Sequence, residues 1–189
     1  MKNVVVVGSQ WGDEGKGKIV DWLSSKADYV ARFQGGNNAG HTIKVDDNVY
    51  KLNLLPSGII RNKKCLIGNG VVLDPWALIN QLRTFRNQKI QIDNDNLFIA
   101  ENVCLILPIH KLIDEINEIS LGTTLIGTTK KGIGRGYGDK VGRKAIRLCD
   151  LSDHDNLKNK IKSLYNFHEP RLSKFTKILD FEKTFEELV

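Results

Sequence analysis

The sequence predicts an α/β fold in which a mostly parallel central sheet is flanked by helices. Short apolar runs typical of buried strands alternate with amphipathic helical segments, which is the pattern of such folds. Glycine-rich turns follow two of these runs, and parallel α/β sheets bind ligands at the carboxyl ends of their strands. The 189 residues are 41% hydrophobic and 26% charged, as in an ordinary globular domain, so disorder is not expected.

The predicted strands are short apolar runs bounded by turn-forming residues. The first is a continuous run of valines, which is typical of a strand buried on both faces. Two others are joined by Asp46-Asp47-Asn48, a connection that favours a hairpin turn. The runs lie at residues 4–7, 29–33, 42–45, 49–55, 65–67, 97–100 and 103–107.

The predicted helices carry apolar residues at helical spacing. The first follows a glycine-rich turn and has Ile19 and Leu23 on one face. Another starts at Asp74-Pro75, because aspartate can cap free amides and proline tolerates the first helical position, and it runs to about residue 86. The remaining helices begin at Pro108 and near residues 156–165 and 180–188.

The end of the chain looks unfinished. Residues 122–142 contain seven glycines, too many for a regular element, so this segment is predicted to be a functional or disordered loop. We treat residues 1–189 as one partial domain with a helical tail at 151–189, ending on the amphipathic stretch FEKTFEELV. An incomplete domain leaves a sheet edge and apolar surface open, so self-association is expected.

Composition excludes several classes of protein. The chain has no run of about 18 apolar residues, no basic leader and no cleavage site, so we expect a cytoplasmic protein that binds no membrane. Its three cysteines, Cys65, Cys104 and Cys149, are widely spaced and fit neither a disulfide framework nor a zinc site. They are predicted to be buried thiols.

The net charge of +6 is concentrated in one segment. Residues 130–147 contain seven basic residues and a single acid, Asp139, and so account for the whole excess. A compact basic segment indicates a phosphate-bearing ligand, either a nucleotide or a nucleic-acid backbone. Tyr137 is the only aromatic residue among these cations, which argues against binding of nucleic acid.

The turn after the valine run reads GSQWGDEGKGK and spans residues 8–18. A strand, a glycine-rich turn with Gly-Lys and a helix in this order are similar to the phosphate cradle of P-loop nucleoside triphosphatases. Backbone amides in such a turn face an anion at the helix N-terminus, and the lysines add positive charge. The residues in question are Gly12, Gly15, Lys16, Gly17 and Lys18.

Two features of this turn depart from the ordinary P-loop, G-x-x-x-x-G-K-[ST]. The spacing is different, and Gly17 stands where a hydroxyl would help to hold magnesium. Asp13 also lies inside the turn, where a bare carboxylate would repel phosphate unless it binds a cation or moves a proton. The alternative is that Asp13 only caps the helix.

Two further stretches carry groups suited to phosphate chemistry. QGGNNAGHT, residues 34–42, follows a strand, and its small residues permit close approach of the backbone to a ligand. Within it, Asn38 offers a donor and an acceptor, and His41 can donate a proton near neutral pH. GTTKKGIGRGYGDKVGR, residues 127–143, adds the hydroxyls of Thr128 and Thr129 to glycines and cations that could close over a phosphate.

Five motifs, in order, closely resemble the N-terminal half of the adenylosuccinate synthetase family. They are QWGDEGKGK, QGGNNAGHT, LPSGI, IGNGVVLDP and GTTKKGIG, and the resemblance is strong over residues 3–150 and looser in the tail. It implies a GTP- and Mg²⁺-dependent ligase that joins IMP and L-aspartate in AMP synthesis, within purine biosynthesis. The implied intermediate is 6-phosphoryl-IMP, from which the amino group of aspartate displaces phosphate to give adenylosuccinate.

The resemblance also implies residue roles. The family's aspartate that matches Asp13 takes the N1 proton of IMP and ligates Mg²⁺, together with the backbone carbonyl that matches Gly40. The histidine that matches His41 acts as general acid while GDP leaves. The arginine that matches Arg143 reaches the partner's IMP across a homodimer interface.

The implied ligand contacts form two overlapping sets. GTP contacts are implied for Gly12, Asp13, Glu14, Gly15, Lys16, Gly17, Lys18, Gly40, His41 and Thr42. IMP contacts are implied for Asp13, Glu14, Gly15, Lys16, Asn38, Ala39, Gly40, His41, Thr129 and Arg143.

The chain departs from the family in two ways. After GTTKKGIG the family continues with a proline, where this chain has Arg135 and two extra glycines, Gly136 and Gly138, which predicts a more mobile loop before ligand binds. Family members are also longer, and their later half recognises aspartate and guanine. A truncated, non-catalytic nucleotide-binding fragment or regulator is therefore the alternative function.

Overall fold

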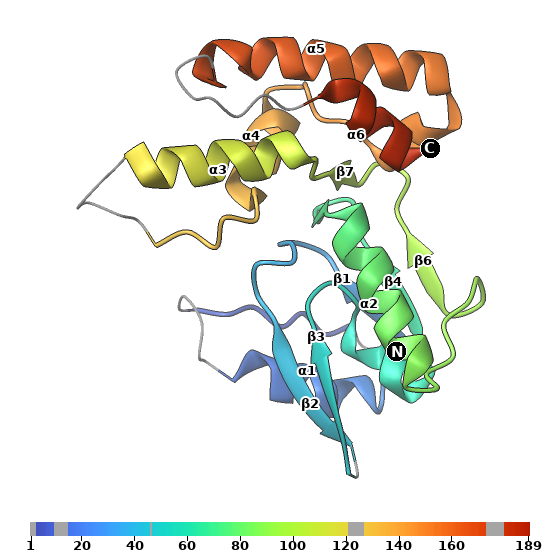
Figure 1. The fold of residues 1–189 in the computed structure, drawn as a ribbon. Coiled ribbons are helices and arrows are strands. Elements are labelled where there is room, and N and C mark those ends of the chain that lie inside the picture. Colours follow the sequence, from blue (N-terminus) through green and yellow to red (C-terminus); the bar gives the residue numbers. More distant parts are fainter. Residues whose placement is uncertain (1–2, 10–14, 46, 121–126, 173–179) are drawn as a thin grey trace.

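The computed structural model describes residues 3–9, 15–45, 47–120, 127–172 and 180–189. In Figure 1 the strands β1 to β4 lie with α1 and α2 in the lower half of the molecule, and the helices α3 to α6 form the upper half. The predicted α/β class, with parallel strands flanked by helices, is confirmed.

Parallel pairing builds the framework that carries the site. β1 (Tyr29–Arg32), β4 (Lys64–Ile67) and β6 (Leu97–Ile99) form one parallel sheet in the order β1-β4-β6. Two shorter strands, β5 (Val72–Leu73) and β7 (Cys104–Leu105), form a second parallel pair. Buried side chains come from β4, β5 and β7, whereas β1 and β6 at the two edges of the first sheet have none.

The predicted hairpin is confirmed as the antiparallel pair β2 (His41–Val45) and β3 (Asn48–Leu52). Its register places His41 opposite Leu52, so the last residue of the glycine-rich stretch 34–41 enters a regular strand. The second strand ends at Leu52, three residues before the predicted end at 55.

The helices follow the predicted order and include one that was not predicted. They are α1 (Lys16–Ser24), α2 (Pro75–Asn87), α3 (Pro108–Ser120), α4 (Ile133–Val141), α5 (His154–Leu172) and α6 (Phe181–Leu188), with short 3₁₀ turns η1 (Ser57–Arg61) and η3 (Leu148–Ser152). The predicted start of α2 is confirmed: the Asp74 carboxylate accepts the amide of Ala77 at 3.1 Å, and Pro75 is the first helical residue.

The prediction that residues 122–142 form no regular element is wrong over α4. This helix starts after Gly132, whose left-handed φ of 72° favours glycine and whose amide donates to Asp114 at 3.1 Å. Gly136 lets the helix lie against Val72 and Ile106, because an added Cβ there would already be 3.3 Å from the Ile106 side chain. Tertiary packing therefore outweighs the poor helix propensity of glycine.

The predicted first strand is also wrong. Residues 4–7 lie outside every strand, and Val5 and Val7 are 70% and 75% exposed. A strand needs backbone partners, and among the described residues β1, β4 and β6 pair only with one another. Ile19 and Trp22 of α1 are exposed as well, so this end of the molecule presents apolar side chains to solvent.

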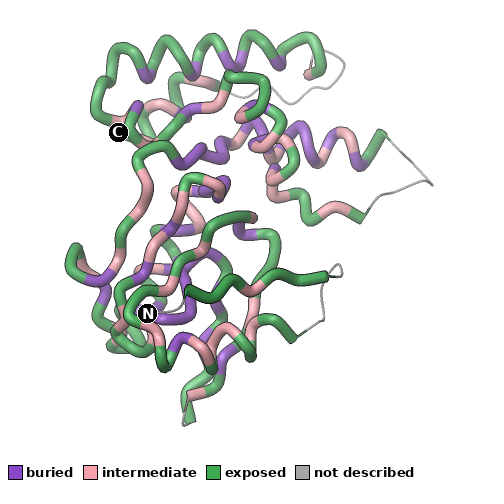
Figure 2. Tube along the Cα trace, turned by 180° about the vertical axis from the view of Figure 1, so that it is seen from behind, coloured by how far each residue is buried: buried purple, intermediate pink, exposed green. Residues whose placement is uncertain are grey.

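One main core joins the sheet to the helices. Buried residues shown in Figure 2 follow β3 and the segment after it, β4, β5 and the start of α3. Its largest fully buried side chains include Phe85, Leu52, Leu54, Ile67, Leu105 and Ile113.

The cysteine prediction is right for two of three residues. Cys65 and Cys104 are buried, and burial raises the pKa of Cys65 to about 12, whereas Cys149 is exposed in η3. In the part of the chain that the structure describes, no helix combines the length and apolar character needed to cross a membrane.

Candidate functional site

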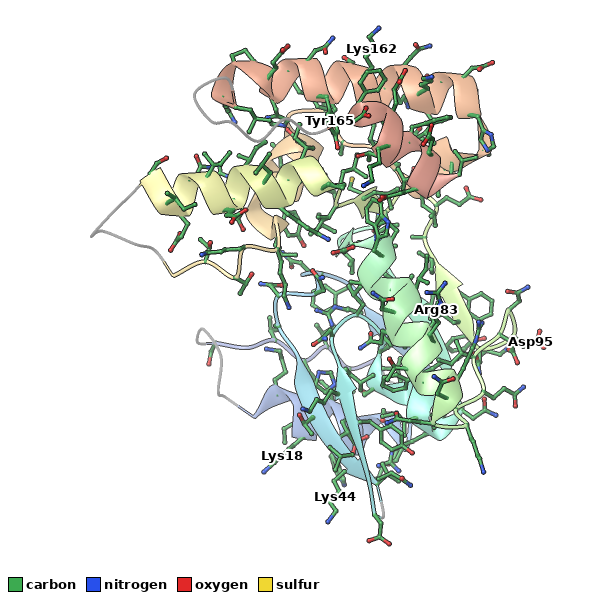
Figure 3. All side chains as sticks on the ribbon, viewed as in Figure 1. Lys18, Lys44, Arg83, Asp95, Lys162 and Tyr165 are labelled. Carbon is green, nitrogen blue, oxygen red and sulfur yellow. The ribbon has the colours of Figure 1, made fainter. Side chains whose placement is uncertain are left out.

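The first motif leads into α1. Gly15 caps the helix with a left-handed φ of 75°, and Lys16 is its first residue, so the amides of the first turn lie at a helix N-terminus. Lys18 points outward from this helix in Figure 3 and is exposed. Gly12, Asp13 and Glu14 lie outside the described residues, so their predicted roles stay predictions.

His41 packs directly against this first turn. A Cβ added to Gly17 would lie 2.7 Å from the His41 Cβ and 3.0 Å from its Cγ, so only glycine fits without displacing the imidazole. The structure thus brings the helix start of the first motif against the last residues of the second, as a phosphate site between them requires.

The environment of His41 favours its neutral form. Burial lowers the pKa of the imidazole, and the positive charges of Arg32 and Lys16 lower it further, while Asp21 opposes this shift. His41 Nε2 is buried and has no hydrogen-bond partner among the described residues. A half-buried ring with an unsatisfied nitrogen is suited to exchange a proton with a bound ligand.

Two side chains from different elements hold the backbone just before His41. The Arg32 guanidinium donates to the Gly36 carbonyl at 2.6 Å and also to the Asn53 carbonyl at the end of the hairpin. The Tyr137 hydroxyl, from α4, accepts the Gly35 amide at 2.8 Å. Gly35 has a left-handed φ of 86°, a conformation that glycine adopts without strain.

The third motif lies over the second. Lys131 Nζ donates to the Asn37 carbonyl at 2.7 Å, and the Asn37 amide group donates to Asp74 at 3.2 Å. Lys111 pairs with the same carboxylate at 2.6 Å. Asp74 therefore caps α2 and also anchors this loop, whereas Asn38, Ala39 and Gly40, which follow, are exposed and accessible to a ligand.

Thr129 is exposed at the start of the third motif, beside a backbone turn fixed by a buried acid. The Glu118 carboxylate accepts the amides of Gly127 and Thr128 at 2.6 and 3.3 Å. Hydrogen bonds of this kind to a carboxylate are stronger than neutral ones, so they fix the backbone at Gly127 and Thr128, directly before Thr129.

Comparison with known proteins agrees with these motifs. The sequence profile of adenylosuccinate synthetase matches residues 5–189. The chain belongs to the adenylosuccinate synthetase family. The match extends through the tail at 151–189, for which the motifs gave only a loose resemblance.

Two solved structures illustrate the relationship. A fully ligated adenylosuccinate synthetase from Plasmodium falciparum is 38% identical, with a TM-score of 0.80 over 96% of this chain, but the match covers 42% of that enzyme. This chain therefore spans less than half the length of that relative. A succinoaminodeoxyadenylate synthetase of cyanophage S-2L, bound to dGMP and to dATP as an energy donor, shares the fold at 24% identity, with a TM-score of 0.53, over 71% of this chain and 36% of its own.

Arg143 of this synthetase-family chain lies apart from the other predicted residues. It is exposed just after α4, with a φ of 58°, and it lines a hollow of about 540 Å³ between α4 and α5. No described residue of the first two motifs lines this hollow. Its cationic residues are Lys140, Arg143, Lys144, Arg147 and Lys160.

Sequence reasoning missed the residues that support the loop at 34–41 of the synthetase fold. Arg32 could have been noticed as a cation placed directly before the glycine-rich motif, at the end of a predicted strand. Asn53 and Tyr137 gave no such signal, because their contacts join segments far apart in sequence. Among the described residues, no cluster of three or more His, Cys, Asp or Glu side chains forms a metal site.

Proposed function

We propose that this chain carries the phosphate-binding and proton-transfer part of a GTP-dependent ligase that joins IMP and L-aspartate. One observation carries the proposal: His41 packs on Gly17 in the first turn of α1, so a half-buried imidazole lies against a helix N-terminus suited to phosphate. Phosphoryl transfer depends chiefly on such positioning and on stabilisation of negative charge.

His41 acts as general acid toward the leaving GDP. In the free chain burial and two neighbouring cations lower the pKa of the His41 ring and so favour its neutral form. Negatively charged phosphates near the ring raise its proton affinity, because an opposite charge favours the imidazolium. The ring then holds a proton where the leaving oxygen develops charge, and it donates that proton as the bond to GDP breaks.

Asp13 supplies the opposite half of the proton transfer. It removes the N1 proton of IMP, and the 6-oxygen forms a bond to the γ-phosphorus of GTP as the bond to the GDP oxygen breaks. The amino group of aspartate then attacks C6 and releases the phosphate with its bridging oxygen. The products are adenylosuccinate, GDP and phosphate.

The residues present fit a magnesium ion. Mg²⁺ prefers oxygen ligands and takes only one or two from the protein, the rest coming from phosphates and water. Gly40 is exposed, and the Asn53 side-chain oxygen lies on the side of Gly40 where a Cβ would stand, so one oxygen donor is close to this point of the loop. Gly40 and Asp13 would hold the ion, which when bound neutralises charge on the phosphates.

The enzyme would act as a cytoplasmic homodimer. The exposed position of Arg143, at the edge of a basic hollow and away from the His41 region, supports a role toward a partner subunit's IMP. Arginine can bind phosphate through two parallel hydrogen bonds, so one exposed guanidinium is enough to complete an anion site.

A non-catalytic nucleotide-binding fragment or regulator is the second candidate. It is favoured by the exposed valines Val4, Val5 and Val7, which pair with no described strand beside the first motif. A protein of this kind would bind nucleotide at the start of α1 without joining IMP and aspartate.

Two assays on the purified chain separate these functions. Phosphate release is measured with GTP, IMP, L-aspartate and Mg²⁺, and again without IMP, while GTP binding is measured at equilibrium. Release that requires IMP supports the ligase. Saturable GTP binding without IMP-dependent release supports the fragment, and absence of both contradicts either function.

Two substitutions test the acid-base roles. Asp13→Asn and His41→Asn are each expected to lower turnover at least about a hundredfold, the typical contribution of acid-base groups. Matched controls are Asp95→Asn and His154→Asn, because both residues are exposed, and Asp95 lies on the opposite side of the molecule from α1 in Figure 3. Near-normal turnover in His41→Asn would remove His41 from the mechanism.

A further inference from the structure

Two polar side chains from different elements form hydrogen bonds with consecutive residues of the glycine-rich loop, Gly35 and Gly36. We infer that Tyr137 and Arg32 are positioning residues, which fix the backbone at Gly35 and Gly36 and so set the placement of Asn38, Gly40 and His41 for the ligand. Tyr137 and Arg32 act through the backbone of the loop and do not contact the nucleotide themselves. The inference rests on the proposed function, because it assigns a purpose to the loop at 34–42.

Tyr137 reaches the loop from α4, about a hundred residues away in sequence. Its hydroxyl accepts the Gly35 amide at 2.8 Å and donates to the Gly70 carbonyl at 2.8 Å, so it uses both of its hydrogen-bonding functions. Burial raises the pKa of Tyr137, which keeps the hydroxyl protonated and able to donate. One phenol thus joins the loop, the end of the IGNG motif and the third motif.

The loop has no room to move toward α4 or β5. A Cβ added to Gly36 would lie 2.5 Å from the Ile133 side chain of α4 and 3.0 Å from the Val72 carbonyl. A Cβ added to Gly70 would collide with the Phe33 carbonyl. The segment is therefore in close contact with α4 and with the chain leading into β5, and a small change in α4 would be transmitted directly to residues 33–36.

Arg32 holds the loop at Gly36. Its guanidinium donates to the carbonyls of Gly36 and Asn53, and Asn53 in turn contacts Gly40. This fork bridges the loop to the end of β3, whose Leu52 is opposite His41 in the hairpin. The two carbonyls are bound by different nitrogens of the planar guanidinium, so the single nitrogen of a lysine would keep the charge but reproduce this paired contact poorly.

Arg32 also contributes to the charge around His41. The charged groups that influence the imidazole are Lys16 and Asp21 on α1 and Arg32 on β1. A lysine at 32 keeps this electrostatic effect and loses the fork, whereas a methionine loses both. The pair of variants therefore separates the backbone contacts of Arg32 from its charge.

The first test compares Tyr137→Phe with Tyr29→Phe, a matched control because Tyr29 is exposed on β1. Loss of one hydrogen bond is expected to speed hydrogen exchange of the Gly35 amide by about fivefold to tenfold in Tyr137→Phe alone. GTP affinity, measured with Mg²⁺ by calorimetry, is expected to fall about tenfold, while the unfolding midpoint in urea changes little.

Each result bears on a different claim. Unchanged exchange of the Gly35 amide in Tyr137→Phe would overturn the inference. Faster exchange with unchanged GTP affinity would overturn the positioning role while leaving GTP binding intact. A wild-type chain that binds neither GTP nor IMP would contradict the proposed function itself, and the exchange rate would still decide whether Tyr137 holds the loop.

A second test measures hydrogen exchange of the loop amides and GTP affinity in two variants of Arg32. Arg32→Met and Arg32→Lys are both expected to speed exchange of the amides at residues 36–38 and to weaken GTP binding, because each variant loses the paired contacts with the Gly36 and Asn53 carbonyls. A role of Arg32 through its charge alone would leave Arg32→Lys like the wild type. Wild-type exchange or full GTP affinity in Arg32→Lys would contradict the assigned role of Arg32.

Discussion

The contact between Gly17 and His41 makes a prediction that can be worked out from distances. In Gly17→Ala the new Cβ would lie 2.7 Å from the His41 Cβ, about 0.8 Å closer than the roughly 3.5 Å optimum for two carbon atoms. Two further atoms of the His41 side chain lie within 3.2 Å of that position. The His41 side chain must therefore move as a whole, because the close contacts involve its Cβ as well as atoms of its ring.

Two opposing effects set the change in stability. Alanine is favoured over glycine in a helix by about 0.8–1 kcal/mol, and overpacking costs about 1–3 kcal/mol. At Gly17 the two effects together lower the free energy of unfolding by up to about 2 kcal/mol. At Gly138 of α4 an added Cβ meets nothing within 4 Å, so Gly138→Ala keeps the helical gain alone and is expected to be stabilised.

Urea unfolding and phosphate release measure the two consequences. Gly17→Ala is expected to be less stable than Gly138→Ala and to lose about a hundredfold in turnover, since a shift of roughly 1 Å in a catalytic group has that effect. Equal stabilisation of both variants would refute the packing of His41 on α1. Full turnover in Gly17→Ala would refute the need for His41 in its present position.

Two further predictions concern groups outside the site. Asp139 is buried between His110 and His168, which donate to it at 3.0 and 2.7 Å; burial alone would raise its pKa, but these hydrogen bonds hold the pKa far below its usual range. Such a group stabilises the fold above its unfolded pKa of about 3.9 and loses that effect as the pH falls. Asp139→Asn should therefore have a free energy of unfolding about 1.5–3 kcal/mol lower at pH 7, and its stability should depend less on acid. Urea unfolding between pH 3 and 7 measures both effects. A steeper acid dependence in the variant would contradict this sign. A thiol reagent should modify the exposed Cys149 rapidly in the native chain, whereas Cys65 should react only after unfolding, because burial keeps Cys65 protonated. Equal rates of modification in the native chain would contradict the buried position of Cys65.

Local signals in the sequence predicted the elements that depend on local chemistry. Asp74-Pro75 specifies the start of α2 through a side-chain cap and a fixed φ, and the hairpin of β2 and β3 follows from an Asp-Asn turn between apolar runs. The glycine at 15 likewise marks the left-handed residue before α1. These features need no partner elsewhere in the chain.

Features that depend on distant partners were predicted wrongly or missed. The valines at 4–7 have the composition of a strand, but pairing depends on a neighbouring backbone, and no described strand pairs with them. The helix α4 forms in spite of its glycines because Gly136 packs closely on Val72 and Ile106. The contact of Tyr137 with Gly35 joins residues 102 positions apart, which periodicity within a short window cannot detect.

Isotope labelling can show whether the chain takes part in phosphoryl transfer from GTP to the 6-oxygen of IMP, as we propose. The most direct measurement supplies IMP labelled with ¹⁸O at that oxygen, together with GTP, L-aspartate and Mg²⁺, and analyses the released phosphate by mass spectrometry. Because phosphate leaves with the oxygen that joined it to C6, we expect one ¹⁸O atom in each phosphate formed. Release of unlabelled phosphate, as simple hydrolysis of GTP would give, would contradict it.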